Sequence, residues 1–258
     1  MNMPFTLKNK IQKKNPILGT WNTLGASLVT DAIAQSGLDF VIIDFEHGPF
    51  ELHRISDYVS HCQAYGCAPI VRLPVPEPWM IQQALDQGAE GLMVPHMQNA
   101  NDVKEFIRTT QFSPKGTRGF TPFTKAGSFN GTNAGDYVKH SNQNIVRSII
   151  IESKEGFENL DEILEIEDLD IVYFGAYDLS AVFGHPGDIY HADVMKPLKQ
   201  GIAKVSAVGK CAGGFVAHSQ NDIKKLLNLG LKFITYGVDA NLLYREYSTV
   251  HQAFKKFQ

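Results

Sequence analysis

Eight short runs rich in β-branched residues alternate with longer amphipathic stretches along this chain, and that alternation constrains the fold more than any other feature. Short apolar runs separated by helical patterns are typical of parallel strands joined by helices. Eight such units in 258 residues match a closed (β/α)8 barrel, whereas an open doubly wound sheet usually has fewer strands. We therefore predict an α/β protein, a single (β/α)8 TIM barrel domain over residues 1–258 with extra terminal helices. The predicted strands are Ile17–Trp21, Phe40–Asp44, Ala68–Leu73, Gly91–Pro95, Val146–Glu152, Ile171–Phe174, Cys211–Val216 and Phe233–Tyr236.

The stretches between these strands carry apolar residues at helical spacing and predict the helices of the barrel. Ser27 is suited to cap the first of them. Gly37, Gly88 and Gly230 precede strands, where a glycine in the left-handed conformation can end a helix and redirect the chain. The predicted helices are Ser27–Ser36, Phe50–Tyr65, Pro78–Gln87, Ala100–Thr110, Gly156–Glu165, Val194–Val208, Ser219–Leu229 and Asn241–Phe257.

Charge and cysteine content exclude several classes of partner. The net charge of -3 gives no reason to expect nucleic acid or an anionic membrane, because both need a basic face. No apolar run approaches the roughly 20 residues that span a bilayer, and Met1 to Lys14 lacks the apolar stretch of a signal peptide. The three cysteines form neither an even disulfide set nor a C-x-x-C pair. We expect them to pack in the core of a cytoplasmic protein.

One connection, residues 112–132, is too long for an ordinary barrel loop and is rich in glycine and proline. Long loops in compact domains are usually functional or disordered. Arg118, Phe120, Phe123 and Phe129 favour an ordered cover over the substrate. Arg118 is therefore a predicted substrate contact.

In a barrel of this type the reacting groups lie where the strands end at their carboxyl side. This rule turns the strand prediction into a list of candidate site residues, which is unusually polar for eight strand ends. The list contains Trp21, Asp44, Glu46, His47, Arg72, His96, Glu152, Asp178 and the turn Gly237-Val238-Asp239.

Glu152 and Asp178 follow consecutive predicted strands and are the best candidates for metal ligands. Two carboxylates with water suit a hard divalent cation such as Mg²⁺ or Mn²⁺ and leave positions open for substrate. Zinc fits less well without paired histidines or cysteines. The alternative for either acid alone is that it caps a helix N-terminus.

The block around the second strand end suggests a proton-transfer group. Asp44 can accept a hydrogen bond from one ring nitrogen of His47 while the other nitrogen faces the pocket, although a lone loop histidine is often a bystander. Arg72 needs an anion, either Asp44 or Glu46 or an anionic substrate oxygen. Trp21 is as well suited to cover the barrel core as to contact substrate.

Two kinds of chemistry find no support in the sequence. A Schiff-base aldolase needs a desolvated lysine that points into the barrel from a strand, and none of the predicted strands contains a lysine. The sequence also lacks a Gly-x-Gly-x-x-Gly fingerprint and a Walker loop, which argues against a nucleotide cofactor.

Taken in order along nearly the whole chain, the motifs resemble those of the HpcH/HpaI aldolases, a family of metal-dependent class II pyruvate aldolases. Some of its members act on 4-hydroxy-2-oxoheptanedioate or on 2-keto-3-deoxy sugar acids. The motifs are Leu18-Gly19-Thr20-Trp21, Asp44-Phe45-Glu46-His47, Val71-Arg72, Leu85-Asp86-Gln87-Gly88-Ala89, Leu92-Met93-Val94-Pro95, Pro114-Lys115-Gly116-Thr117-Arg118-Gly119, Ile151-Glu152, Asp178-Leu179-Ser180 and Gly237-Val238-Asp239.

The resemblance implies a carbon–carbon lyase that cleaves or forms 4-hydroxy-2-oxo acids from a 2-oxo acid and an aldehyde, through a metal-bound pyruvate enolate. It implies that Glu152 and Asp178 bind Mg²⁺, Mn²⁺ or Co²⁺ and that Arg72 stabilises the enolate oxygen. His47, supported by Asp44, would then manage protons. It also implies a homo-oligomer, often a hexamer whose C-terminal helices exchange between neighbours.

The chain departs from the family pattern at two places beside the predicted metal ligands. Ile150 stands where members commonly carry Gln, and Gly175-Ala176-Tyr177-Asp178 replaces a Gly-Pro-Ala-Asp run. Gly175 and Tyr177 are predicted substrate contacts, and Tyr177 adds bulk and a hydroxyl group. A shifted substrate, an acyl-CoA lyase of the citrate lyase β-subunit type and a non-catalytic ligand-binding barrel remain as alternatives.

Overall fold

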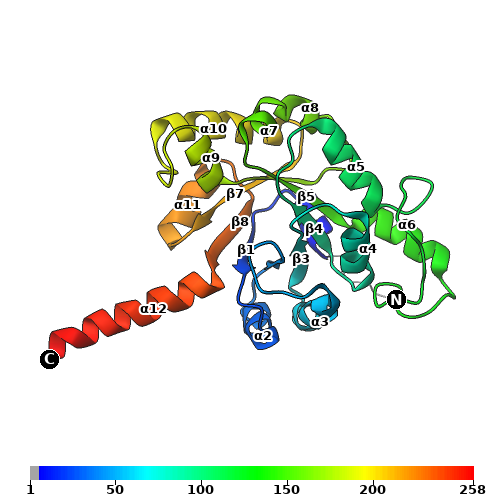
Figure 1. Cartoon of the computed structure of the whole chain (residues 1–258), viewed down its shortest axis with the longest axis horizontal. Coiled ribbons are helices and arrows are strands. Elements are labelled where there is room, and N and C mark those ends of the chain that lie inside the picture. The colour runs from blue at the N-terminus through cyan, green and yellow to red at the C-terminus, as the bar shows by residue number, and fades with distance from the viewer. Residues whose placement is uncertain (1–5) are drawn as a thin grey trace.

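Eight parallel strands close into a barrel in sequence order, as the computed structural model of residues 6–258 shows (Figure 1). Residues 1–5 of the predicted domain lie outside the described residues, as do the side chains of Thr6 and Phe215. Each strand pairs with the next, and β1 pairs with β8 to close the ring. The predicted TIM barrel is confirmed. The strands are β1 Ile17–Asn22, β2 Phe40–Asp44, β3 Ala68–Arg72, β4 Gly91–Val94, β5 Val146–Ile151, β6 Ile171–Phe174, β7 Cys211–Ala217 and β8 Phe233–Val238.

The strands are apolar on both faces because each face meets a different core. Alternate residues such as Phe40, Ile42 and Ile70 fill the barrel interior, and their neighbours pack outward against the helices. The rings of Phe40 and Phe233 stack inside the barrel with centroids 4.0 Å apart. Gly19 lies against Phe40, where a Cβ atom would overlap the ring. The small residue on β1 therefore makes room for the large one on β2.

The helices surround the barrel, as the ring of labelled elements in Figure 1 shows. N-terminal helix α1 inserts Leu7 into the inner core. The helices are α1 Thr6–Gln12, α2 Ser27–Gln35, α3 Ile55–Ala64, α4 Pro78–Asp86, α5 Ala100–Thr110, α6 Ala134–Asn144, α7 Lys154–Glu158, α8 Leu160–Leu164, α9 Ala176–Val182, α10 Ala192–Ala207, α11 Gln220–Asn228 and α12 Asp239–Phe254, with short 3-10 helices at Leu52–Arg54 and Lys255–Phe257.

Helix boundaries differ from the prediction in a few places. Ala26, without a side-chain hydrogen bond, occupies the N-cap of α2, so the prediction that Ser27 caps this helix is wrong. The stretch expected as one helix over 156–165 is divided between α7 and α8 at Asn159. The expected left-handed glycines are confirmed by the φ values of +88° at Gly37, +97° at Gly88 and +94° at Gly230.

Helix α12 is the one element that leaves the body of the barrel, and Figure 1 shows it as a long red rod pointing away from the other helices. It begins at Asp239, directly after β8, and its first turn stays close to β1 and β8. Within residues 6–258, no helix has the length and apolarity that crossing a bilayer requires.

Candidate active site

A cavity of about 360 Å³ opens at the carboxyl ends of the barrel strands. Its wall combines charged groups at or just beyond the strand ends with apolar side chains from the strands themselves. The predicted site residues that line it are Trp21, Asp44, His47, Arg72, Glu152, Gly175, Tyr177, Asp178 and Val238. The barrel therefore brings together residues that are up to 217 positions apart in the sequence, since Trp21 and Val238 both line this cavity.

Arg72, the last residue of β3, is held in place by two acids and an aromatic ring. Its Nε donates to Asp44 Oδ1 at 2.8 Å, and Nη2 donates to the other Asp44 oxygen. Its guanidinium carbon lies 4.5 Å from the centroid of the Trp21 ring. Asp44 and Arg72 are direct neighbours in the β2–β3 register, so the sheet itself aligns this pair. A guanidinium has five N–H donors, and the pair with Asp44 leaves the others for Glu46 and the cavity.

Glu46 and His96 connect the arginine to the predicted metal ligand. Glu46 Oε2 lies 2.8 Å from Arg72 Nη1, in ionic contact without hydrogen-bond alignment. The His96 ring lies between two acids, with Nε2 at 3.4 Å from Glu46 and Nδ1 at 2.7 Å from Glu152. His96 has a φ of +57°, an uncommon conformation for a residue other than glycine, and its N–H also donates to Glu152 at 2.8 Å. This backbone turn fixes one oxygen of Glu152.

The expected contact between Asp44 and the His47 ring does not form. Asp44 Oδ1 accepts the backbone N–H groups of Glu46 at 3.1 Å and of His47 at 3.2 Å, while both carboxylate oxygens face Arg72. Asp44 thus shapes the turn and holds the arginine. His47 lies exposed on the loop after β2 and lines the cavity at its mouth.

Gly48 is essential to the turn that places His47. Its N–H donates to Asp44 O at 3.0 Å. A Cβ atom at Gly48 would lie 2.6 Å from that same carbonyl oxygen and 2.6 Å from the Phe50 ring. Glycine is therefore required at position 48 by the close approach of the chain to itself.

Glu152 follows β5 and is mostly buried beside further negative charge. Burial raises the pKa of its carboxyl group, and the nearby acids Asp178 and Glu46 raise it further, against the opposing effect of His96. Asp178 lies exposed in the first turn of α9. Ionised acids that gather around one partly buried carboxylate are stabilised by a cation between them.

The space beside Glu152 suits such a cation. Gly175 has no side chain at the point where a Cβ atom would lie 2.8 Å from Glu152 Cβ and 3.2 Å from Glu152 Oε2. The Oε2 atom therefore faces a gap that any other residue would narrow. Carboxylate oxygens are the donors that Mg²⁺ and Mn²⁺ prefer, so the residues present fit a hard divalent ion.

Comparison with known proteins decides the family of this barrel. Residues 18–245 match the model of the HpcH/HpaI aldolase/citrate lyase family. The chain belongs to this family. A hydroxypyruvate/pyruvate aldolase from Roseovarius nubinhibens is 31% identical over 92% of each chain. A 4-hydroxy-2-oxo-heptane-1,7-dioate aldolase from Escherichia coli is 33% identical over 94% of this chain and 92% of its own.

The solved structures agree with the sequence comparison. An HpcH/HpaI aldolase/citrate lyase family protein from Burkholderia cenocepacia superposes with a TM-score of 0.90 at 29% identity, over 97% of this chain and 99% of its own. Relatives named as aldolases over most of the chain confirm the expected enzyme class, a carbon–carbon lyase of the aldolase type.

One wall of the cavity in this HpcH/HpaI barrel is apolar. Ile150, the first departure from the family pattern, lies there together with Tyr173, Val216 and Val238. The sequence-based list of site residues included Val238 but omitted Tyr173, Val216 and Thr23. Their positions at the ends of predicted strands were the available signal, because inward-facing residues near the carboxyl end of a barrel strand line the mouth. Tyr177, in the second departure, is 54% exposed at the rim.

Arg118 does not reach this cavity, so the structure contradicts its prediction as a substrate contact. Its side chain is fully buried beneath the long loop, where Nη2 donates to Asp86 at 2.6 Å and Nη1 donates to Ser141 at 3.2 Å. Its guanidinium also lies 4.3 Å from the centroid of the Phe112 ring. The arginine thus anchors its own loop to α4 and α6.

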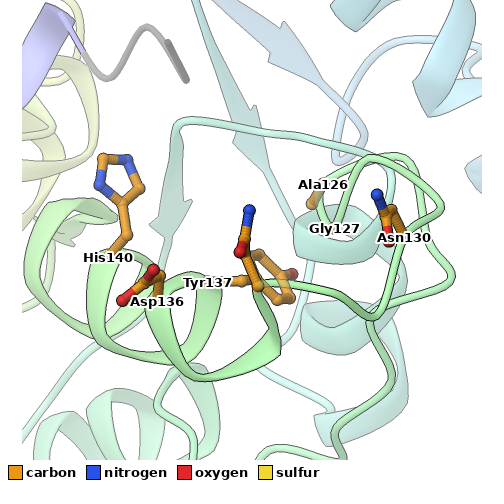
Figure 2. A pocket seen from close by; sticks show the side chains of 7 residues that line it. Ala126, Gly127, Asn130, Asp136, Tyr137 and His140 are labelled. Carbon is orange, nitrogen blue, oxygen red and sulfur yellow. The ribbon is translucent and has the colours of Figure 1, made fainter. Parts of the chain in front are cut away.

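The long loop packs beside α6, away from the barrel mouth, and the expectation that it covers the substrate is corrected. Figure 2 shows this loop facing α6 across a separate cavity of about 160 Å³. Asn130 and Gly127 lie on the loop side, and Asp136, Tyr137 and His140 come from α6. Lys125 fixes the loop to α3 through hydrogen bonds to Ser56 O and Ser60 Oγ.

In the candidate turn at the end of β8, Val238 lines the cavity, whereas Asp239 has a structural role. Asp239 is buried and accepts hydrogen bonds from Asn22 Nδ2 at 2.6 Å and from Thr23 N at 2.9 Å and Oγ1 at 2.7 Å. It therefore ties the loop after β1 to the start of α12. Among the described residues this carboxylate already has its partners and lies outside the cavity lining.

Proposed function

We propose that this protein is a divalent-metal-dependent aldolase that cleaves or forms 4-hydroxy-2-oxo acids, with pyruvate or a close 2-oxo acid as one partner and an aldehyde as the other. The observation that carries the proposal is one cavity wall that joins Glu152 and Asp178 to Arg72 and His47. This set supplies cation ligands, a fixed positive charge and a proton carrier in one place. Aldol cleavage of the metal-dependent type uses all three.

Glu152 and Asp178 would hold the metal ion, with Mg²⁺, Mn²⁺ or Co²⁺ as candidates. When bound, the ion supplies positive charge beside the oxygen that becomes negative as the carbon–carbon bond breaks. Glu152 Oε1 is already fixed by the N–H and ring of His96, so the carboxylate enters the site in one orientation. Second contacts of this kind orient the ligands of metal sites.

Arg72 would bind the 2-oxo group and stabilise its developing negative charge. In cleavage, the C4 hydroxyl loses a proton and its oxygen forms the aldehyde carbonyl as the C3–C4 bond breaks. The electron pair of that bond becomes the C2–C3 double bond of an enolate, and the negative charge moves to the C2 oxygen. Because Asp44 holds the guanidinium by two hydrogen bonds, its remaining N–H donors are oriented before the substrate arrives. Such preorganised donors lower the barrier without reorganisation during the reaction.

His47 would exchange the proton of the C4 hydroxyl with solvent. Its imidazole lines the mouth of the cavity and is exposed, so it can reach both the aldehyde side of the substrate and water. Imidazole is the side chain best suited to proton exchange near neutral pH. We assign Asp44 to the support of this step through the turn and Arg72, because its carboxylate does not contact the His47 ring.

The apolar wall would select the substrate. Ile150 offers no hydrogen bond where an amide would offer one, and Trp21 covers the inner end of the cavity. A hydrophobic wall favours a 2-oxo acid whose third carbon carries hydrogen or a small alkyl group. Gly175 leaves room beside Glu152, and the Tyr177 hydroxyl at the rim would contact the aldehyde half.

The proposal includes a homo-oligomer, with a hexamer as the expected state. Helix α12 carries exposed apolar residues at four- and three-residue spacing, which places them on one face. These residues are Leu243, Tyr247, Val250 and Phe254. A large exposed apolar stripe marks a protein contact, and a second copy of this chain carries the same stripe.

We also propose that the chain acts as one barrel domain over residues 1–258 in the cytoplasm. The three cysteines are unpaired and buried, as a reducing compartment allows. Burial raises the pKa of the Cys211 thiol to about 12. The pKa of the Cys62 thiol is also raised, mainly by its hydrogen bond to Cys67 and then by burial. These thiols are therefore packing groups, and they take no part in the proposed chemistry.

The test is retro-aldol turnover of 4-hydroxy-2-oxo acids, measured as pyruvate release. We expect activity with Mg²⁺, Mn²⁺ or Co²⁺, its loss after EDTA and its return when metal is added again. Glu152→Gln should abolish turnover, whereas Glu162→Gln, an exposed acid on α8, should leave it unchanged. Full activity in EDTA would contradict the proposal. Turnover of acyl-CoA thioesters alone would instead indicate the citrate lyase type of reaction.

A further inference from the structure

Two histidines from the connection between α9 and α10 meet an aspartate from the first turn of α10, outside the cavity. The rings of His185 and His191 stack with centroids 3.4 Å apart and planes 18° apart. Asp193 Oδ2 lies 3.3 Å from His185 Nε2 and 3.6 Å from His191 Nδ1. The side chains are 31%, 36% and 73% exposed in that order, so an ion can reach them from solvent.

The distances within this cluster match those around a four-coordinate ion. One ligand atom from each residue lies within 4.8 Å of the other two. Bonds from zinc to imidazole nitrogen or carboxylate oxygen are about 2.1 Å long, and two such ligands at a tetrahedral angle are about 3.4 Å apart. The separations of 3.3 and 3.6 Å bracket that value. Within the described residues, no other group of three His, Cys, Asp or Glu side chains has its ligand atoms within 4.8 Å of one another.

We propose that His185, His191 and Asp193 bind a divalent transition-metal ion such as Zn²⁺ or Ni²⁺, with water in the remaining positions. Two imidazole nitrogens and one carboxylate oxygen form a donor set that suits these ions, whereas Mg²⁺ prefers oxygen ligands. The chain then holds two sites of different chemistry. The cavity site offers carboxylates, and this second site offers imidazoles.

Binding requires one exchange of partners within the cluster. His191 Nδ1 accepts the backbone N–H of Asp193 at 3.2 Å and so caps the start of α10. When the ion takes this nitrogen, the N–H group is left in the first turn of an exposed helix end. Water satisfies such groups there, so the exchange costs little.

An ion at this position would fix the segment that follows the cavity helix. The His185 N–H donates to Ser180 O at 2.7 Å, and the Gly187 N–H donates to Ser180 Oγ at 2.9 Å. The Ser180 hydroxyl in turn donates to Tyr177 O at 2.6 Å. The ion would thus fix the connection to the start of α10. Through the contacts with Ser180, it would also fix the connection to α9, the helix that carries Tyr177 and Asp178. Its expected effect is greater stability, since it binds only the folded arrangement.

The experiment titrates Ni²⁺ into the metal-stripped full-length protein by calorimetry, in the presence of excess Mg²⁺ to occupy the cavity. We expect one Ni²⁺ per chain, and His191→Asn should weaken its binding by at least ~tenfold. Asn is a good N-cap, so this variant keeps the start of α10. His251→Asn on α12 is the matched control, because His251 is also exposed and lies outside the cluster.

A second arm separates this site from the cavity. In the Glu152→Gln background, Co²⁺ should still give the visible absorption of a tetrahedral nitrogen and oxygen site, and His185→Asn should remove it. Equal Ni²⁺ affinity in the wild type, His185→Asn and His191→Asn proteins would overturn the proposal. Neither arm measures turnover, so the result is independent of the proposed aldolase activity.

Discussion

Arg72 is the single residue whose charge and orientation matter most to the proposed reaction. Arg72→Lys would keep a positive charge but lose the two-pronged contact with Asp44 and the contact with the Trp21 ring. We expect kcat/KM for pyruvate release to fall by about 10²- to 10³-fold, as when one donor to a developing oxyanion is removed. Arg108→Lys, an exposed arginine paired with Glu105, should leave kcat/KM unchanged. An Arg72→Lys enzyme with full kcat/KM would remove Arg72 from the mechanism.

The raised pKa of Glu152 predicts how the stability of the metal-free protein depends on pH. Burial raises the pKa of this carboxyl group, so the folded state binds its proton more tightly than the unfolded state does. Ionised Glu152 therefore destabilises the fold when the pH lies above its pKa in both the folded and the unfolded state. This destabilisation is lost as the pH falls through the raised pKa of the folded state. In EDTA, Glu152→Gln should raise the Tm more at about pH 8 than at about pH 4. A lower Tm for the variant at the higher pH would contradict this account.

The sequence predicted which residues form the site as far as it predicted where the strands end. Asp44, His47, Arg72, Glu152 and Asp178 lie at or just beyond the ends of predicted strands, and a barrel brings such positions to one mouth. The charge of Arg72 predicted an anionic partner, and Asp44 and Glu46 were both named, but the choice between these acids and a substrate oxygen was open, because it depends on the register between strands and on individual side-chain directions.

His96 illustrates this limit. Its contacts with Glu46 and Glu152 arise from a positive φ angle, and nothing in the residue type requires that conformation. Arg118 was predicted to contact substrate and does not, because an arginine in a long loop can point into the protein as readily as toward a substrate. The packing of α4 and α6 around it determines that it points into the protein.

At the scale of elements, the turn from β6 into α9 determines how much space Glu152 has. Gly175→Ala would place a methyl group 2.8 Å from Glu152 Cβ and 3.2 Å from Oε2, so the helix or the acid must shift. We expect a weaker apparent affinity for the activating metal, with kcat reduced as well. The measurement is pyruvate release across a Mg²⁺ titration.

Gly135→Ala on α6 is the control for that substitution. A Cβ atom there meets no atom within 4 Å, so the change should leave the metal dependence unaltered. It should also stabilise the fold by about 0.5–1 kcal/mol, because glycine is less favourable than alanine inside a helix. If both variants shift the Mg²⁺ titration equally, the space beside Glu152 does not limit metal binding.

The strands were predicted well and some helices were not, for a physical reason. Strands buried on both faces read as continuous apolar runs, which few other elements share. Helix α6 has the sequence AGDYVKHSNQN, with few strong helix formers, and α9 has only seven residues. Helix α6 is held by tertiary contacts such as the hydrogen bonds between Asn142 and Phe112, which sequence periodicity does not reveal.

For the whole molecule, the face of α12 predicts how chains associate. Tyr247→Asp places a charge at the centre of the apolar stripe, where Tyr247 is 73% exposed in the single chain. We expect a smaller assembly by size-exclusion chromatography with light scattering, because a buried unpaired charge is costly at an interface. Gln252→Asp, on the opposite side of the helix, should keep the wild-type mass. A monomeric wild-type protein would contradict the proposed oligomer.

The bond between Asn22 and Asp239 joins positions 217 residues apart. At about 5–20 residues per second, a ribosome needs on the order of ten to forty seconds to add the chain between them. Throughout that interval β1 is an open sheet edge, since its partner β8 has not been made. The nascent chain is therefore most prone to aggregate through this edge just before β8 is synthesised, and α12 follows once the ring can close.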